Sequence, residues 1–111
     1  MRLPLVAALC VAATGALAAD KPTRFWNLTS VTITSLSLAP EGTERWGRNQ
    51  CENDRDGEVD PRERLPITGV APGRYDVRMT DKSGRVCLAR AVEVRDGAVF
   101  ALADKDLECR P

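Results

Sequence analysis

The sequence predicts an all-β domain, a small antiparallel β-sandwich or open barrel of about six strands with one long acidic loop. Short runs rich in β-branched and aromatic residues recur between residues 24 and 103, with turn residues between them. One connection, from Trp46 to Glu63, is longer than the others and rich in acidic residues. Residues 1–19 resemble a cleavable signal peptide, and their removal leaves about 90 residues, which is enough for a single domain.

Residues 1–19 have the organisation of a secretory signal peptide. Arg2 forms a positive n-region, an apolar h-region follows, and Ala16-Leu17-Ala18 is a small-x-small cleavage signal. The segment is too short and too rich in small residues to anchor in a membrane, so we expect no membrane insertion after cleavage. The preference for arginine over lysine and the abundance of alanine are typical of a high-GC bacterium. We therefore expect a periplasmic or secreted protein whose domain is residues 20–111.

The charge balance excludes some classes of partner. The chain has 16 basic and 16 acidic residues, and removing Arg2 with the signal leaves 15 and 16, a net charge of −1. This balance argues against nucleic acid or an anionic membrane surface as a partner. Without histidine, no Ser-His or Cys-His nucleophile exists, and the carboxylates crowd one polar loop rather than an apolar pocket. We expect a protein that is not an enzyme.

Three cysteines remain after Cys10 leaves with the signal: Cys51, Cys87 and Cys109. In an oxidising compartment two of them should pair and stabilise so small a domain by about 2–4 kcal/mol. Cys109 lies near the end of the chain, so we expect a bridge to Cys109, with Cys51 and Cys87 equally suitable partners. The odd thiol could also form an intermolecular bridge. Zinc is not expected, because histidine is absent and the cysteines lack ligand spacing.

The first half of the domain predicts two strands, at residues 24–28 and 31–38, joined by a hairpin at Thr29-Ser30. The alternation of apolar residues changes parity along the second strand, which predicts a bulge near Thr34-Ser35. Asn27-Leu28-Thr29 matches a glycosylation acceptor but is more simply a turn sequence. Trp46 is expected to fill the core under the long loop, with ligand stacking as the alternative.

Further strands are predicted at residues 65–70, 74–81, 85–95 and 98–103. Pro66 suits an edge strand or a strand start. The inward residues are expected to be Tyr75, Val77 and Met79 in one strand, and Val86, Leu88, Val92 and Val94 in the next. Asp96-Gly97 indicates a two-residue hairpin, and residues 104–109 indicate a polar tail.

The acidic loop, Cys51 to Glu63, resembles the calcium loop of an EF-hand. Placing Gly57 at position 6, where a positive φ is required, puts oxygen ligands at positions 1, 3, 5, 7, 9 and 12. These ligands are Glu52, Asp54, Asp56, Glu58 through its carbonyl, Asp60 and Glu63. They suit Ca²⁺ or another hard cation.

The flanks of this loop favour a loop without paired helices, because Pro66 stops an exit helix and the preceding segment has two glycines. The alternative is a solvated acidic loop held by Asx-turns, with Arg55, Arg62 and Arg64 as counter-charges.

Two wider resemblances add to this interpretation. Residues 67–84 resemble the "PG-x-Y-x-V-x-x-x-D-x-x-G" hairpin of extracellular immunoglobulin-like and prealbumin-like β-modules. A second set of segments resembles small exported bacterial domains of unknown function, which tend to have Ser-Pro at residues 39–40 and lack the acidic insertion. These segments are Asn27-x-Thr29, Ile33-x-x-Leu36, Ala39-Pro40, Trp46-Gly47 and Tyr75-Asp76-Val77-Arg78. Neither resemblance carries a catalytic residue to this chain.

Together these observations predict a periplasmic or secreted, non-enzymatic binding or interaction module with a Ca²⁺-binding loop. The alternative is a small secreted inhibitor or adaptor of another envelope protein, in which the acidic loop holds no metal.

Overall fold

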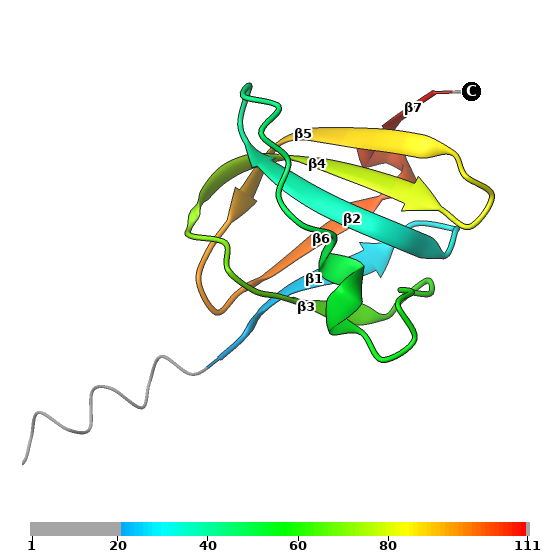
Figure 1. Ribbon diagram of the computed structural model, residues 1–111, viewed down its shortest axis with the longest axis horizontal. Coiled ribbons are helices and arrows are strands. Elements are labelled where there is room, and N and C mark those ends of the chain that lie inside the picture. Colours follow the sequence, from blue (N-terminus) through cyan, green and yellow to red (C-terminus); the bar gives the residue numbers. More distant parts are fainter. Residues whose placement is uncertain (1–20, 111) are drawn as a thin grey trace, which may run out of the picture.

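The computed structural model describes residues 21–110, which form a sandwich of two β-sheets (Figure 1). One sheet has the strand order β3-β1-β6 and the other the order β2-β4-β5-β7. The strands are β1 Thr23–Leu28, β2 Ile33–Pro40, β3 Arg64–Ile67, β4 Gly73–Asp81, β5 Val86–Val94, β6 Val99–Ala103 and β7 Glu108–Cys109. Two short 3₁₀ helices are η2, Gln50–Asn53, and η3, Asp104–Asp106.

The all-β prediction is therefore confirmed, with seven strands in this part of the chain rather than about six. The predicted signal peptide, residues 1–19, lies outside the described residues, as does Cys10. Between residues 21 and 110 no helix has the length and apolar character needed to cross a bilayer.

The core lies between the two sheets and follows the period-2 alternation of the strands. The three-stranded sheet contributes Phe25, Leu65, Ile67, Phe100 and Leu102, and the four-stranded sheet contributes Leu36, Leu38, Val77, Met79, Ala89 and Val94. Phe25 and Phe100 lie on neighbouring strands with ring centroids 5.6 Å apart. Burial of this apolar surface is the main favourable contribution to folding.

The predicted hairpin at Thr29-Ser30 is wrong, because β1 and β2 belong to different sheets. Both edges of β1 are occupied: it pairs antiparallel with β3 and parallel with β6. The chain instead crosses from one sheet to the other after Leu28, the last residue of β1. The preceding Asn27 is fully buried and accepts hydrogen bonds from the amide and hydroxyl of Thr29. The turn interpretation of this tripeptide is correct, and the buried amide is not accessible to a glycan.

Two bulges set which residues of the four-stranded sheet face the core. The first interrupts the pairing of β2 between Ile33 and Ser35, as predicted. The second lies opposite Asp76, where Ala91 has a φ of 56° and donates its amide hydrogen to the Asp76 carboxylate. This second bulge was not predicted.

The second bulge changes the parity of β5. Cys87 and Ala89 face the core before it, and Val92 and Val94 do so after it. The prediction that Val86 and Leu88 share the core face with Val92 and Val94 is therefore wrong, since the extra residue inverts the alternation. Val86, which is 37% exposed, lies on the outer face of the sheet.

Asp96-Gly97 forms a turn but not a hairpin. Gly97 has a φ of 71°, and the amide of Ala98 donates to the carbonyl of Arg95. The strands on either side, β5 and β6, nevertheless lie in different sheets, so the turn carries the chain across the sandwich.

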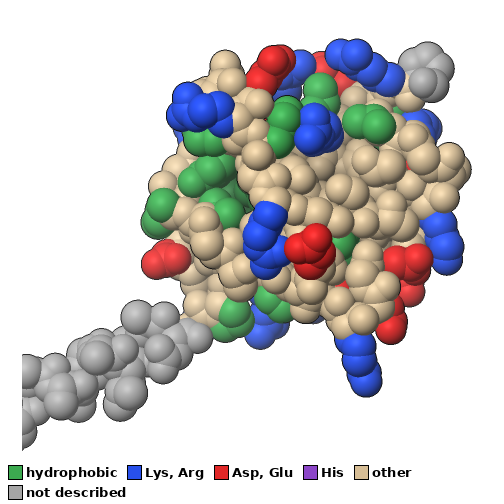
Figure 2. All heavy atoms as spheres, viewed as in Figure 1, with side chains coloured by type: hydrophobic (Ala, Val, Ile, Leu, Met, Phe, Trp, Pro, Cys, Tyr) green, Lys and Arg blue, Asp and Glu red, His purple; other side chains and the backbone are tan. Residues whose placement is uncertain are grey.

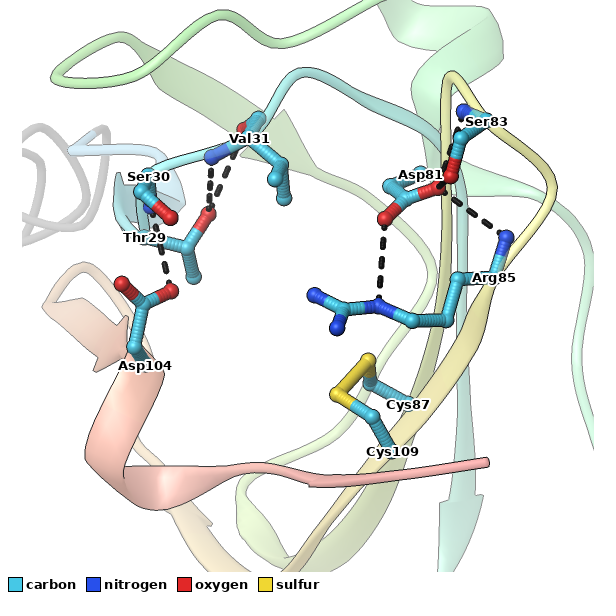
Figure 3. The surroundings of a disulfide bond; sticks show 9 residues. All are labelled: Thr29, Ser30, Val31, Asp81, Ser83, Arg85, Cys87, Asp104 and Cys109. Carbon is cyan, nitrogen blue, oxygen red and sulfur yellow. Dashed lines mark hydrogen bonds and ion pairs between the residues drawn. A yellow bond between two sulfur atoms is a disulfide. The ribbon is translucent and has the colours of Figure 1, made fainter. Parts of the chain in front are cut away.

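Residues 104–109 are polar and mostly exposed, as predicted, but they belong to the folded domain and are not a tail. They form η3 and then β7, which pairs with β5 and is joined to it by the disulfide Cys87–Cys109 (Figure 3). The carboxylate of Asp104 accepts from the amide of Ser30, a second link at the start of this segment. A bridge to Cys109 is thus confirmed, with Cys87 as its partner, and Cys51 is a buried free thiol.

We predict that replacing both bridged cysteines, Cys87→Ser with Cys109→Ser, lowers the free energy of unfolding by about 2–4 kcal/mol, because the bridge restricts the unfolded chain. Urea denaturation of the oxidised proteins measures the difference. In the mature wild-type protein, without residues 1–19, one thiol, that of Cys51, should react with a thiol reagent only after unfolding. A thiol that reacts at once in the folded protein would contradict this pairing.

Candidate functional site

The acidic loop is anchored to the sandwich at its apolar residue, Val59. The amides of Val59 and Ile33 each donate to the carbonyl of the other over 2.9 Å, and the Val59 side chain is 2% exposed. Gly57 has a φ of 75°, the positive value that its position in the loop predicts. The loop therefore has a defined path against β2.

Asn27 also binds the acidic loop at Val59. Its Nδ2 donates to the carbonyls of Val59 and Val31, each over 3.0 Å, inside the protein. Its backbone amide donates to the backbone carbonyl of Glu63, and its backbone carbonyl accepts from the backbone amide of Arg62. The uncharged side chain of Asn27 thus links β1, to which it belongs, to the crossover and to the acidic loop.

Two further amides order the start of the loop. The Asn49 side-chain oxygen accepts from the amides of Leu36 and Cys51. The Gln50 side chain pairs with the backbone of Thr68, accepting from its amide and donating to its carbonyl, each over 3.0 Å. We call Asn27, Asn49 and Gln50 the amide clamp. Because these groups are uncharged, the clamp orders the segment without using any carboxylate.

The first three acidic residues of the predicted calcium site have separate surroundings. Glu52 forms an ion pair with Arg48, Oε1 to Nη1, at 3.3 Å. Asp54 forms an Asx-turn, accepting from the amide of Asp56 over 2.9 Å, and Asp56 itself is exposed.

The remaining acidic residues also have their own partners. Glu58 forms an ion pair with Lys82 at 3.6 Å. Asp60 accepts from the hydroxyl of Thr32 over 2.8 Å, and Glu63 accepts from the amide of Asp60 over 2.9 Å. The contact of Glu63 with Asp60 has the form of half a capping box, but β3 follows instead of a helix.

As arranged, these residues do not fit an EF-hand site, in which the ligands converge on one ion. Across residues 21–110 no three acidic or cysteine side chains form a group that could hold a metal. Calcium binding stays a prediction. The predicted counter-charges are wrong, since Arg48 and Lys82 make the ion pairs, and Arg64 lies instead over the Trp26 ring.

A second candidate site, which the sequence did not predict, lies on the outer face of the four-stranded sheet. It is a groove of about 520 Å³, the Trp46 groove, lined by Glu44, Trp46, Arg78, Gly84, Val86, Leu88 and Arg110. The Arg78 guanidinium carbon lies 4.4 Å from the centroid of the Trp46 ring, a cation–π contact. The parity change in β5 turns Val86 and Leu88 towards this groove.

Trp46 does not fill the core, so that prediction is wrong. The amide of Gly47 donates to the carbonyl of Leu38, so the segment around Trp46 lies along the edge of β2. The indole of Trp46 is therefore half-buried and lies outside the core. The alternative, a ligand-stacking tryptophan, stays a prediction.

The polar groups of the groove are mostly donors. Among the described residues, the guanidinium groups of Arg78 and Arg110 and the indole N–H of Trp46 have no hydrogen-bond or ion-pair partner. Glu44 is the one carboxylate among the described residues that line the groove. The amide of Arg110 donates to the carbonyl of Val86, so β7 and the disulfide hold this arginine at the groove.

Elsewhere the charges are mixed. In Figure 2 the basic and acidic side chains are scattered over the face shown and not gathered by sign. A second stacked pair, Arg64 over Trp26 at 4.0 Å, lies on the three-stranded sheet outside the Trp46 groove. The Trp26 indole N–H, unlike that of Trp46, donates to the carbonyl of Arg62.

Shifted pKa values mark groups that serve the fold. A hydrogen bond from the Gly42 amide, with a second from Ala91, lowers the pKa of Asp76. The Ser83 hydroxyl and the Arg85 amide lower that of Asp81 in the β4–β5 turn (Figure 3). Burial, with the charges of Asp54 and Glu58, raises the pKa of Cys51 to about 11, opposite to what a nucleophilic thiol requires.

Comparison of this chain with family models, curated proteins and solved structures finds no match.

We predict that Asn27→Ala lowers the free energy of unfolding by about 2–4 kcal/mol, because it leaves the buried Thr29 amide without a partner and removes one of the two hydrogen bonds to the Val59 carbonyl. Chemical denaturation measures the loss. Asn53→Ala, which removes hydrogen bonds at the loop surface, is the control and should cost clearly less. Equal losses for the two variants would show that Asn27 has no special role.

We also predict an acid-dependent loss of stability that depends on Asp76 and Asp81. Their folded-state pKa values lie below the unfolded value, about 3.9, so their stabilising effect is complete above that pH and is lost as the pH falls through the folded pKa. Urea midpoints from pH 7 to pH 2 should fall less steeply in Asp76→Asn with Asp81→Asn than in the wild type. Asp96→Asn, whose carboxylate accepts no hydrogen bond from the described residues, should retain the wild-type slope.

Proposed function

We propose that this chain is an exported, non-enzymatic interaction module that binds another protein of the cell envelope through the Trp46 groove. The observation that carries the proposal is the stacked Trp46–Arg78 pair, whose donors face a groove and have no partner among the described residues. Tryptophan and arginine dominate the binding energy of protein interfaces when they lie at such positions. The signal-like sequence of residues 1–19 and the disulfide both favour an oxidising compartment.

Support for a non-enzymatic role comes from the titratable groups. The three aspartates with lowered pKa values among the described residues, Asp76, Asp81 and Asp106, accept hydrogen bonds from backbone amides, which gives them a structural role. The free thiol of Cys51 is buried and its pKa is raised. These groups stabilise the sandwich, and none of them lines the Trp46 groove.

A calcium-loaded acidic loop is the second candidate, and Gly57 favours it, because its φ of 75° is the value an EF-hand loop requires at position 6. For an ion to bind, the Glu52 side chain must leave Arg48 and the Asp60 side chain must leave Thr32, whereas Glu58 would bind through its backbone carbonyl. The amide clamp already orders the loop, so the free energy of ion binding has to exceed the cost of breaking these contacts. We propose the metal-free loop as the functional state.

We predict that the immobilised mature protein retains one partner at near-equal molar amounts from envelope extract, equally in millimolar Ca²⁺ and in EDTA. Trp46→Ala with Arg78→Ala should abolish capture, because together they remove the stacked pair. Arg64→Ala, which breaks the matching stack on the other sheet, is the control and should capture normally. Quantitative mass spectrometry of the retained proteins measures the outcome.

Two results would contradict this proposal. Capture that survives loss of the stacked pair would place the binding surface elsewhere. Capture that requires Ca²⁺, together with heat in a calorimetric titration of Ca²⁺ into the mature protein, would assign the acidic loop to metal binding.

A further inference from the structure

We propose that the Trp46 groove takes an acidic peptide segment in which a carboxylate lies beside an apolar side chain. This inference rests on the proposed function and names the chemistry that the partner must present. It follows from three properties of the groove: its surplus of donors, its apolar wall and its size.

The donors call for an anionic acceptor. Among the described residues that line the groove, Arg78 and Arg110 each present five N–H groups and Trp46 presents one, against the single carboxylate of Glu44. The nearby arginines Arg85 and Arg90 are already paired, with Asp81 and Glu108. The positive charge left over is therefore that of Arg78 and Arg110, and a planar guanidinium binds a carboxylate through two parallel hydrogen bonds.

Stacking prepares Arg78 for such a contact. The Trp46 ring supports one face of the guanidinium at 4.4 Å, while the in-plane N–H groups that bind a carboxylate stay free of partners among the described residues. A side chain held in this way loses less conformational freedom on binding than a mobile one.

The apolar wall distinguishes a peptide from a free anion. Val86 and Leu88 line the same groove as the two arginines, and Val86 is 37% exposed. A phosphate or acetate ion would leave this wall in contact with water, whereas an apolar residue next to an aspartate or glutamate would cover it. The groove volume of about 520 Å³ lies within the range of pockets that hold small ligands and therefore fits a few residues of peptide.

The test uses the ¹⁵N-labelled mature protein and a peptide of three Asp-Leu repeats with both ends blocked. Trp46 and Trp26 each give a separate indole N–H signal, so one protein contains both the probe and its internal control. We expect the Trp46 signal to shift in a saturable manner and the Trp26 signal to stay in place. Arg78→Ala should weaken binding about ten- to hundredfold, because it removes a charge-assisted contact. Arg64→Ala should change it by less than about twofold.

Three control ligands separate the alternatives. Repeats of Asn-Leu remove the charge and repeats of Asp-Ser remove the apolar side chain, and each should bind at least about tenfold more weakly than Asp-Leu. Inorganic phosphate should give no saturable shift at matched ionic strength. Equal binding of the Asn-Leu or Asp-Ser peptide, or a saturable shift with phosphate alone, would overturn the inference.

Two further outcomes have distinct meanings. A Trp46 signal that moves with protein concentration in the absence of peptide would assign the groove to a second copy of this chain and overturn the inference. If envelope capture depends on Trp46 and Arg78 but the peptide fails to bind, the proposed function stands and the acidic ligand class is wrong. If both fail, both proposals are wrong.

Discussion

The fully buried amide of Asn27 is the constraint on which the arrangement of the sandwich depends. A buried amide has two donors and an acceptor to satisfy, and leaving one unpaired costs more than the hydrogen bond contributes when it is made. Asn27 meets this requirement by binding the crossover at Thr29 and Val31 and the acidic loop at Val59. The crossover to the second sheet and the path of the loop are therefore coupled through one side chain.

This coupling changes the explanation of how the acidic loop becomes ordered. Crowded carboxylates suggest that a segment needs a cation before it can become ordered, yet here neutral groups order the backbone. Asn49 and Gln50 bind the start of the loop to β2 and to the segment after β3, and Val59 is buried at its centre. The carboxylates remain on the surface, where ion pairs such as Glu52 with Arg48 contribute little to stability.

The bulge opposite Asp76 links the fold to the proposed binding surface. By adding one residue to β5 it turns Val86 and Leu88 outward, and the groove forms where these side chains meet Trp46 and Arg78. The disulfide completes the groove, because it fixes β7 against β5 and so places Arg110 beside Val86. A local irregularity in the backbone and a covalent link near the end of the chain thus shape one surface.

Local chemistry in the sequence by itself determined the fold class, most strands, the bulge of β2, the positive φ of Gly57 and the bridging of Cys109. Alternation and turn residues act over a few neighbours, so they can be recognised without the fold. Which strands pair, which partner Cys109 takes, and whether six acidic residues converge depend on contacts between distant segments. Strand pairing at β1 excluded the hairpin at residues 29–30, and the bulge opposite Asp76 reversed the faces of β5. Only the tertiary structure decided these features, because one extra residue or one crossover moves every later side chain to another face or sheet.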